Sequence, residues 1–284
     1  MSKIAIVTDS TSYLPSELVQ KYNITVAPQV LIWDDKTYRD GIDIKSAEFF
    51  ARLKTSKTMA TTSQVSVADM QSIFQGLVER DYEVLGMFIS SKLSGTIQSA
   101  TQAKALMENA GGKVTVVDTN STAMAMGFQV LTVARAAQDG AGLKDCVALA
   151  EKARESTGVF FAVDTLEFLH RGGRIGGAQR FLGTLLNMKP ILALQDGKVE
   201  GLERIRTKTK AHEKVLEMVV ENAKGKTPIR IATLHANAPE DAKVLLAKAE
   251  KELNPVESIL AELSPVVANH TGPGTVGLAY MAGM

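Results

Sequence analysis

The stretch KIAIVTDS, residues 3–10, decides the fold class that we expect for this chain of 284 residues. Its apolar run ends in polar turn residues, as expected of a parallel strand that runs into the loop at its carboxyl end. Further strands are expected at 25–33, 82–90 and 113–119, and helices at 14–23, 45–56, 66–81, 94–112, 122–138 and 143–155. This alternation of strand and helix predicts an open, mostly parallel α/β sheet.

The second half of the chain has a different pattern. A hairpin is expected around Asp196-Gly197, a pair of residues that favours a tight turn between strands. Other strands are expected at 158–165, 229–236 and 258–263, and helices at 166–187 (punctuated by glycines), from about Ala211, and at 239–253. A hairpin mixed with helices favours an α+β domain with some antiparallel pairing. We therefore expect two domains, residues 1–157 and 158–284.

Composition narrows the class of protein. Hydrophobic residues make up 45% and charged residues 22% of the chain, as is ordinary for a globular protein with a core. A formal net charge of +1 gives no general attraction to nucleic acid or to an anionic membrane. The apolar run at the start is too short for a signal peptide, and no segment approaches 18 uninterrupted apolar residues. We therefore expect a cytoplasmic protein without stable membrane insertion.

The number and spacing of the cysteine and histidine residues argue against a metal centre. The single cysteine, Cys146, excludes an internal disulfide and a cysteine-rich metal site, and is expected to be a small core residue. His235 and His270 have no histidine or cysteine nearby at the spacing of metal ligands. We expect no bound metal.

Four polar stretches lie where strands or helices are expected to end, which is where open α/β sheets bind ligands. They are TDSTS (8–12), TTSQ (61–64), SSKLSGTIQSA (90–100) and HRGGRIGG (170–177). In the third, the Ser94 hydroxyl and the N–H groups of a helix start would suit an anion, although Ser94 could equally serve only as a cap. The fourth lacks the G-x-G-x-x-G order of a dinucleotide site, so contact with an anion or a partner is the better interpretation.

Two further stretches leave their roles open. RIRTKTK (204–210) carries four basic side chains at a spacing of two, which in an extended chain would line one face. NHTGPGTVGLAY (269–280) sets His270 beside a glycine-rich turn. That turn could cradle a phosphate, carry a proton, hold a carboxylate or only reverse the chain.

Six motifs in order resemble the DegV family, and the resemblance covers essentially the whole chain. They are DSTSYLP (9–15), TTSQ (61–64), SSKLSGTIQSA (90–100), DTLEFLHRGGRI (164–175), RIRTKTKA (204–211) and HTGPGTVGLAY (270–280). The resemblance implies two α/β domains with a long-chain fatty acid, such as palmitate or oleate, in a tunnel between them. It also implies a FakB-type, fatty-acid-binding subunit of bacterial fatty acid kinase. A separate ATP-dependent subunit would then phosphorylate the carboxylate of the bound acid.

The resemblance also assigns roles to residues of this chain. It implies carboxylate contacts at Thr62 and Ser94, with His270 alongside. The supporting loop residues are Ser63, Gly95, Thr96 and Gly272, and contact with the kinase or its phosphate falls to Arg174 and Arg206. The family often has proline after TSQ, where this chain has Val65. That difference leaves the Thr62 hydroxyl in place.

Two alternatives stay open beside a fatty-acid carrier without catalytic activity of its own. One is a stand-alone hydrolase or transferase for a small anionic substrate, with Ser94 as nucleophile or anion clamp and His270 as acid or base. The other is a regulatory module that senses lipid without presenting it to a kinase.

Overall fold

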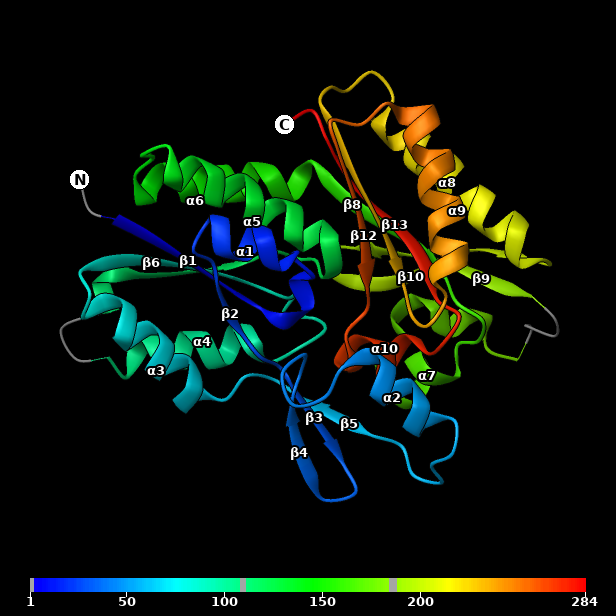
Figure 1. Ribbon diagram of the computed structural model, residues 1–284, viewed down its shortest axis with the longest axis horizontal. Coiled ribbons are helices and arrows are strands. Elements are labelled where there is room, and N and C mark those ends of the chain that lie inside the picture. The colour runs from blue at the N-terminus through cyan, green and yellow to red at the C-terminus, as the bar shows by residue number, and fades with distance from the viewer. Residues whose placement is uncertain (1–2, 108–110, 184–187) are drawn as a thin grey trace.

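The computed structural model describes residues 3–107, 111–183 and 188–284, which form three sheets and the helices around them (Figure 1). The expected α/β fold with two larger units is confirmed: a parallel sheet comes first in the chain, and a mixed sheet follows. The expected helical segments over 94–112 and 166–187 extend onto residues 108–110 and 184–187, which lie outside the described residues.

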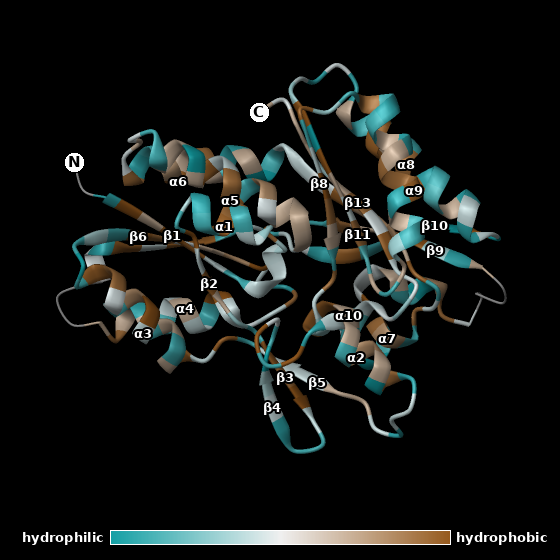
Figure 2. Ribbon diagram, viewed as in Figure 1, coloured by the Kyte–Doolittle hydropathy of each residue, from teal (hydrophilic) through white to brown (hydrophobic). Residues whose placement is uncertain are grey.

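The first sheet has four parallel strands in the order β2-β1-β6-β7. Its strands are β1 (Lys3–Asp9), β2 (Thr25–Ala27), β6 (Tyr82–Phe88) and β7 (Val114–Asp118). Helices α3 (Val67–Val78) and α4 (Thr96–Ala105) cover one face, and α5 (Ala123–Gln138) and α6 (Leu143–Glu155) cover the other, with α1 (Ser16–Lys21) beside them (Figure 1). Because both faces are covered, β1 and β6 are apolar along most of their length, as Figure 2 shows.

Local signals placed several of these helices correctly. Ser66 caps α3, since its Oγ accepts a hydrogen bond from the backbone N–H of Asp69 over 3.0 Å. The expected helices 122–138 and 143–155 match α5 and α6 within one residue. Cys146 is buried in the core beside α5, as expected.

The second large sheet has six strands in the order β10-β9-β8-β13-β11-β12. They are β8 (Thr157–Ala162), β9 (Lys189–Gln195), β10 (Lys198–Ile205), β11 (Ile229–His235), β12 (Glu257–Glu262) and β13 (Val276–Ala282). All neighbours are antiparallel except β11 and β12, and helices α8 (Lys208–Ala223) and α9 (Pro239–Leu253) pack on one face. The hairpin turning at Asp196-Gly197 is confirmed, and both residues have the positive φ that such a turn requires.

A third, small sheet was not expected. The segment 25–33 was predicted as one strand, but Pro28 separates β2 from β3 (Val30–Trp33), and β3 pairs with β4 (Lys36–Arg39) and β5 (Thr61–Ser63). Proline removes a ladder donor, which is why the strand breaks there. Helix α2 (Ser46–Leu53) lies between β4 and β5 in the sequence, inside the expected range 45–56.

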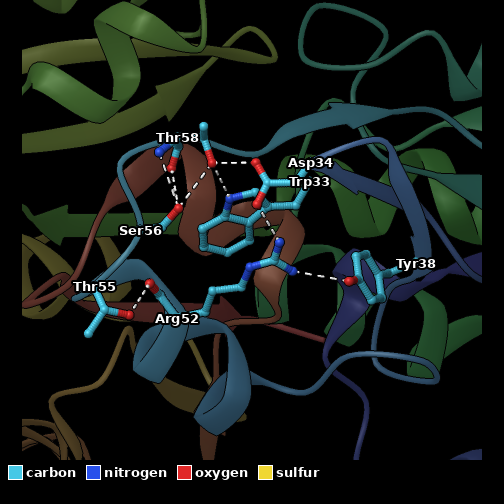
Figure 3. Close-up of polar contacts among 7 residues, drawn as sticks. All are labelled: Trp33, Asp34, Tyr38, Arg52, Thr55, Ser56 and Thr58. Carbon is cyan, nitrogen blue, oxygen red and sulfur yellow. Dashed lines mark hydrogen bonds and ion pairs between the residues drawn. The ribbon is translucent and has the colours of Figure 1, made fainter.

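The loop before β5 is fixed by a cluster of polar contacts (Figure 3). The Asp34 carboxylate accepts hydrogen bonds from Arg52 at 2.7 Å and from the Thr58 hydroxyl at 2.5 Å. Trp33 Nε1 donates to the same Thr58 hydroxyl, and the Arg52 guanidinium lies 4.4 Å from the centre of the Trp33 ring. The cluster joins α2, the β3–β4 hairpin and the segment that leads into Thr62.

Three expectations for the second half are corrected. The range 166–187 is not one helix, because α7 (Glu167–Arg171) ends at consecutive glycines and a short 3-10 helix (Gly176–Phe181) follows. RIRTKTK is not extended throughout, since β10 ends at Ile205 and α8 begins at Lys208. NHTGPGTVGLAY is more than a turn: it ends helix α10 (Pro265–Thr271) and contains β13, which lies inside the sheet. Two further short 3-10 helices, Ser10–Ser12 and Gly111–Lys113, complete the described elements.

Helix α5 lies between the two large sheets (Figure 1). It contacts β1 on one side and β8, β11 and β13 on the other, and eleven of its residues are buried. Because most of its residues are buried between the two sheets, α5 is a core helix. The domain boundary between residues 157 and 158 stays a prediction.

Candidate functional site

A pocket lies between the carboxyl end of the parallel sheet and the face of the six-stranded sheet that α5 covers. Its space free of protein atoms is about 930 Å³, part of it open to solvent. Its apolar lining comprises Ile89, Leu93, Ala123, Val159, Phe161, Leu169, Leu194, Val199, Leu234, Leu263, Val266 and Val267. Its polar side chains include Thr11, Gln29, Thr62, Ser63, Gln64, Ser94, Thr122, Arg174, His270, Thr271 and Thr275.

The three residues expected to hold a carboxylate all line this one pocket. Thr62 comes from β5, Ser94 from the loop before α4, and His270 from α10, so three distant segments of the chain contribute. Thr62 Oγ1 lies 2.7 Å from Nε2 of His270, which is a hydrogen bond. Ser63 also lines the pocket.

The burial of His270 determines the charge of its ring. Burial, with a smaller contribution from the positive charge of Arg174, lowers the pKa of His270 to about 4, so the ring is neutral at pH 7. Its Nδ1 is buried without a partner among the described residues, whichever ring nitrogen carries the proton. A ligand that accepts a hydrogen bond from Thr62 Oγ1 requires the proton on Nε2, which then donates to Thr62. In that tautomer the proton of the Thr62 hydroxyl is free to donate to the ligand.

A glycine makes this position of the ring possible. The imidazole packs against Gly172, where a β-carbon would overlap Nδ1. Gly272, just after α10, has φ +78° and packs on the Phe168 ring, so it turns the chain and does not line the pocket. Its expected supporting role is therefore to end α10 behind His270.

Ser94 belongs to a second chain of hydrogen bonds. The Gln29 side-chain Nε2 donates to Thr96 Oγ1 over 2.8 Å, and Thr96 Oγ1 lies 3.0 Å from Ser94 Oγ. Since Thr96 accepts from the amide, its own proton can go to Ser94, which then has its proton free for a ligand. Gly95 supports this loop, because the Gln64 side chain packs closely against it. Ser94 also accepts from the backbone N–H of Thr96, so the cap and the anion interpretations both fit.

The two arginines expected to contact a partner lie in different surroundings. Arg174 lines the pocket, and its guanidinium donates to the backbone carbonyls of Leu93 and Gly172 at 3.1 and 2.6 Å. Arg206 is exposed in the turn between β10 and α8, outside the pocket lining. The structure therefore brings Arg174, and not Arg206, into the pocket that Thr62, Ser94 and His270 line.

A buried carboxylate that sequence reasoning missed holds α10 in place. Asp40 Oδ2 accepts from the hydroxyls of Ser10 and Ser264, both at 2.7 Å, and Oδ1 accepts from the backbone N–H of Val266 at 3.2 Å. Burial raises the pKa of Asp40 to about 6. Asp40 thus joins the loop after β1 to the start of the helix that carries His270.

Gln29 was missed as well. It is buried within a segment that was predicted as continuous strand, and Pro28 was the signal that could have marked a loop there.

In the TDSTS loop, the Asp9 carboxylate accepts hydrogen bonds from the backbone N–H and the hydroxyl of Thr11 and from the Ile89 backbone N–H. That loop therefore binds strand ends together, and only its Thr11 lines the pocket.

In the part of the chain that the structure describes, no helix is both long and apolar enough to cross a membrane. Nor do three or more His, Cys, Asp or Glu side chains gather in that part at the spacing of a metal site.

Fold and pocket together define a class: a two-unit α/β protein whose largely apolar pocket is also lined by hydroxyl side chains. The family model described as "Uncharacterised protein, DegV family" matches residues 3–283. A DegV domain-containing protein of Halalkalibacterium halodurans is 32% identical over 281 residues, covering 99% of each chain. One of Streptomyces coelicolor is 35% identical over 277 residues, covering 97% of each. The chain belongs to the DegV family.

Solved structures agree with this assignment. A DegV family protein from Thermus thermophilus, described by its fatty acid binding, superposes with a TM-score of 0.93 at 38% identity, covering 99% of each chain. DegV of Bacillus subtilis, a fatty acid binding protein, gives 0.90 at 30% identity, with 99% of this chain and 100% of that chain covered. A stearic acid-binding protein from Eubacterium ventriosum gives 0.90 at 25%, with 99% and 98% covered.

Proposed function

We propose that the chain binds one long-chain fatty acid, such as palmitate or oleate, in the pocket between its two large sheets. The observation that carries this proposal is a largely apolar pocket that the Thr62 and Ser94 hydroxyls both line, in hydrogen-bond networks that allow each to donate to a ligand. A carboxylate leaving water needs such donors, and hydrogen bonds to a charged group are the stronger kind. The solved relatives described as fatty acid binding support the ligand class.

In this proposal the carboxylate accepts from Thr62 and Ser94, while His270 acts behind Thr62 by holding its hydroxyl oxygen. Arg174 adds positive charge to the pocket, which favours an anion there. The methylenes of the acyl chain lie against the apolar lining. About 14 buried methylenes give on the order of 11 kcal/mol of gross stabilisation, of which binding retains only part.

The chain is proposed to have no catalytic activity alone, and no cofactor. A Ser94–His270 hydrolase or transferase is the weaker candidate, because the hydrogen bonds of Ser94 run to Thr96 and that of His270 runs to Thr62. A pKa of about 4 also makes His270 a poor general base at neutral pH.

We further propose that the bound carboxylate is presented to a separate ATP-dependent kinase subunit, which forms the acyl-phosphate for lipid metabolism. Arg206, exposed outside the pocket, is free of the site and suits contact with such a partner. The cytoplasm is the proposed compartment, since a lone buried cysteine fits a reducing environment.

Trapping acyl-phosphate with hydroxylamine, with and without a bacterial fatty acid kinase subunit and ATP, tests the proposed phosphorylation of the bound acid. Acyl hydroxamate formed without that subunit would contradict it.

Displacement of a fluorescent fatty acid tests the carboxylate site. Palmitate should compete far better than its methyl ester, and Thr62→Val and Ser94→Ala should each weaken palmitate binding about 10- to 100-fold, the effect of losing a hydrogen bond to a charge. Thr101→Val, which removes an exposed hydroxyl on α4, is the matched control and should change nothing. Equal competition by acid and ester would refute the site.

A further inference from the structure

Gln29 is a buried residue whose place is fixed through its backbone. It follows Pro28 in the segment between β2 and β3 and is 2% exposed. Its backbone N–H donates to the Ser10 hydroxyl over 3.1 Å, and its backbone carbonyl accepts from the Asp40 N–H over 2.9 Å. Gln29 also lines the pocket, so the fold holds its side-chain amide firmly beside the loop that carries Ser94.

Asp9 determines which way round this amide lies. The Asp9 carboxylate accepts hydrogen bonds from the N–H and the hydroxyl of Thr11 and from the N–H of Ile89. Burial raises the pKa of Asp9, and these hydrogen bonds, with a further one from the Gln29 side chain, oppose that rise. A carboxylate offers its neighbours only acceptors, so the NH2 group of the amide faces Asp9. That group also makes the contact with Thr96.

The direction of these hydrogen bonds passes along the chain to Ser94. Thr96 is fully buried, and its Oγ1 accepts from Gln29 Nε2 over 2.8 Å. The proton of the Thr96 hydroxyl therefore goes to Ser94 Oγ, 3.0 Å away. The backbone N–H of Thr96 donates to the same Ser94 oxygen. Because both lone pairs of this oxygen are then occupied, the Ser94 hydroxyl meets a ligand only as a donor.

Thr62 is not restricted in this way. Its partner His270 is neutral, and Nδ1 of that ring is buried without a partner in the described part of the chain. The tautomer can therefore change without breaking another hydrogen bond, and the Thr62 hydroxyl then either donates to a ligand or accepts from it. The site presents one hydroxyl of fixed direction and one that adapts.

We propose that Gln29 is a positioning residue that fixes Ser94 as a donor, so that the site selects ligand head groups with an acceptor beside Ser94. The inference rests on the proposed fatty acid binding. An ionised carboxylate has acceptors only, so it needs both Ser94 and Thr62 as donors. A primary amide of nearly the same shape has an acceptor and a donor. It fits whichever way Ser94 points, because it can place its oxygen or its nitrogen there.

Gln29→Glu tests the proposal, because it keeps the shape of the side chain and removes its NH2 group. The new carboxyl group donates nothing when ionised, and any proton that it takes goes to the stronger acceptor, the Asp9 carboxylate. Thr96 then donates to position 29, and its oxygen accepts from Ser94. Palmitate affinity should fall about 10- to 100-fold and palmitamide affinity less than about threefold. Displacement of a fluorescent fatty amide, whose own binding should persist, measures both.

Adding Thr96→Val to Gln29→Glu separates this effect from charge repulsion. The charge at position 29 stays, but no hydroxyl carries the reversed direction to Ser94. Palmitate should therefore regain about tenfold in affinity over the single variant, the effect of restoring one hydrogen bond to a charge. Repulsion by the charge alone would give no recovery.

Gln129→Glu is the matched control. Gln129 of α5 is 1% exposed and also donates to a threonine hydroxyl, that of Thr157, over 2.9 Å, but it lies outside the chain of hydrogen bonds that leads to Ser94. This variant should lower stability and leave the ratio of palmitate to palmitamide affinity unchanged.

Gln29→Met keeps the test available if Gln29→Glu does not fold. It removes the donor without adding charge, so Thr96 can point either way and the affinity ratio should fall about threefold, the cost of a hydroxyl no longer held in advance. A native ratio in every folded Gln29 variant, no recovery on adding Thr96→Val, or a native chain that binds palmitate but not palmitamide overturns this inference alone. A native chain that binds neither overturns the proposed function as well.

Discussion

His270 shows at the scale of one residue how burial determines chemistry. The ring lies in the protein interior beside a positive charge, and both effects disfavour its protonated form. The ring is therefore neutral at neutral pH and forms a hydrogen bond with Thr62. In the proposed binding mode this makes His270 a positioning residue for the Thr62 hydroxyl.

A lowered pKa at His270 also has a consequence for stability. Between pH 6.5 and about 4 the unfolded chain binds a proton at this residue that the native chain does not, so the free energy of unfolding falls as pH falls through that window. The full difference is on the order of 3 kcal/mol. His270→Gln should remove this loss, measured by guanidinium unfolding at pH 4.5 and pH 7. NMR titration of the ligand-free native ring should show a midpoint well below 6, and a midpoint near 6.5 would contradict the account.

At the scale of elements, Asp40 connects three segments that are distant in the sequence. Its carboxylate binds Ser10 after β1 and both Ser264 and Val266 at the start of α10, which carries His270. Burial outweighs these hydrogen bonds and raises the pKa, so the native chain holds a proton here that the unfolded chain has lost above pH 4.

The pH dependence expected from Asp40 is opposite to that from His270. Its contribution to the free energy of unfolding is complete below about pH 4 and is lost as pH rises through about 6. In the native protein the two slopes partly cancel. Asp40→Asn should therefore make stability rise more steeply from pH 4 to 6.5 than in the native chain, as followed by guanidinium unfolding across that range. An unchanged slope would show that Asp40 does not titrate there.

The polar cluster before β5 is a second link between elements (Figure 3). Arg52 binds Asp34 and Tyr38 and lies over Trp33, which fixes the loop leading to Thr62. Exposed ion pairs contribute little to overall stability, so Arg52→Met should lower the melting temperature only slightly. It should nevertheless speed the release of bound fatty acid about fivefold, measured by stopped-flow transfer to albumin, because a misplaced Thr62 loses about 1 kcal/mol of contact.

Arg39→Met is the matched control for that prediction. Arg39 makes a comparable exposed ion pair with Asp43 at the end of β4, away from the loop that leads to Thr62. Its release rate should equal that of the native chain. Equal rates in all three proteins would show that the Arg52 cluster does not position the site.

For the whole molecule, the sequence predicted what local periodicity encodes. The parallel sheet, the helices α3, α5 and α6 and the hairpin at Asp196-Gly197 follow from apolar runs, caps and turn residues. The small sheet did not follow, because its three-residue strand β5 is too short to have a period. Strand β13 was missed because the glycine-rich segment that precedes it resembles a loop, although every residue of the strand is buried.

The candidate site was only partly predictable for the same reason. Resemblance of motifs picked out Thr62, Ser94 and His270, which all line one pocket. The chain of hydrogen bonds from Gln29, the position of Arg174 inside the pocket and the Asp40 link depend on contacts between segments far apart in the sequence. No local pattern encodes such contacts.

Lipid extraction tests the central claim most directly. The purified chain is denatured, its organic extract is analysed by mass spectrometry, and the amount of acid is compared with the amount of protein. A ligand enclosed between two sheets should survive purification, so the account predicts close to one equivalent of long-chain fatty acid. Protein that yields no fatty acid, and that also fails to take up added palmitate or oleate, would contradict it.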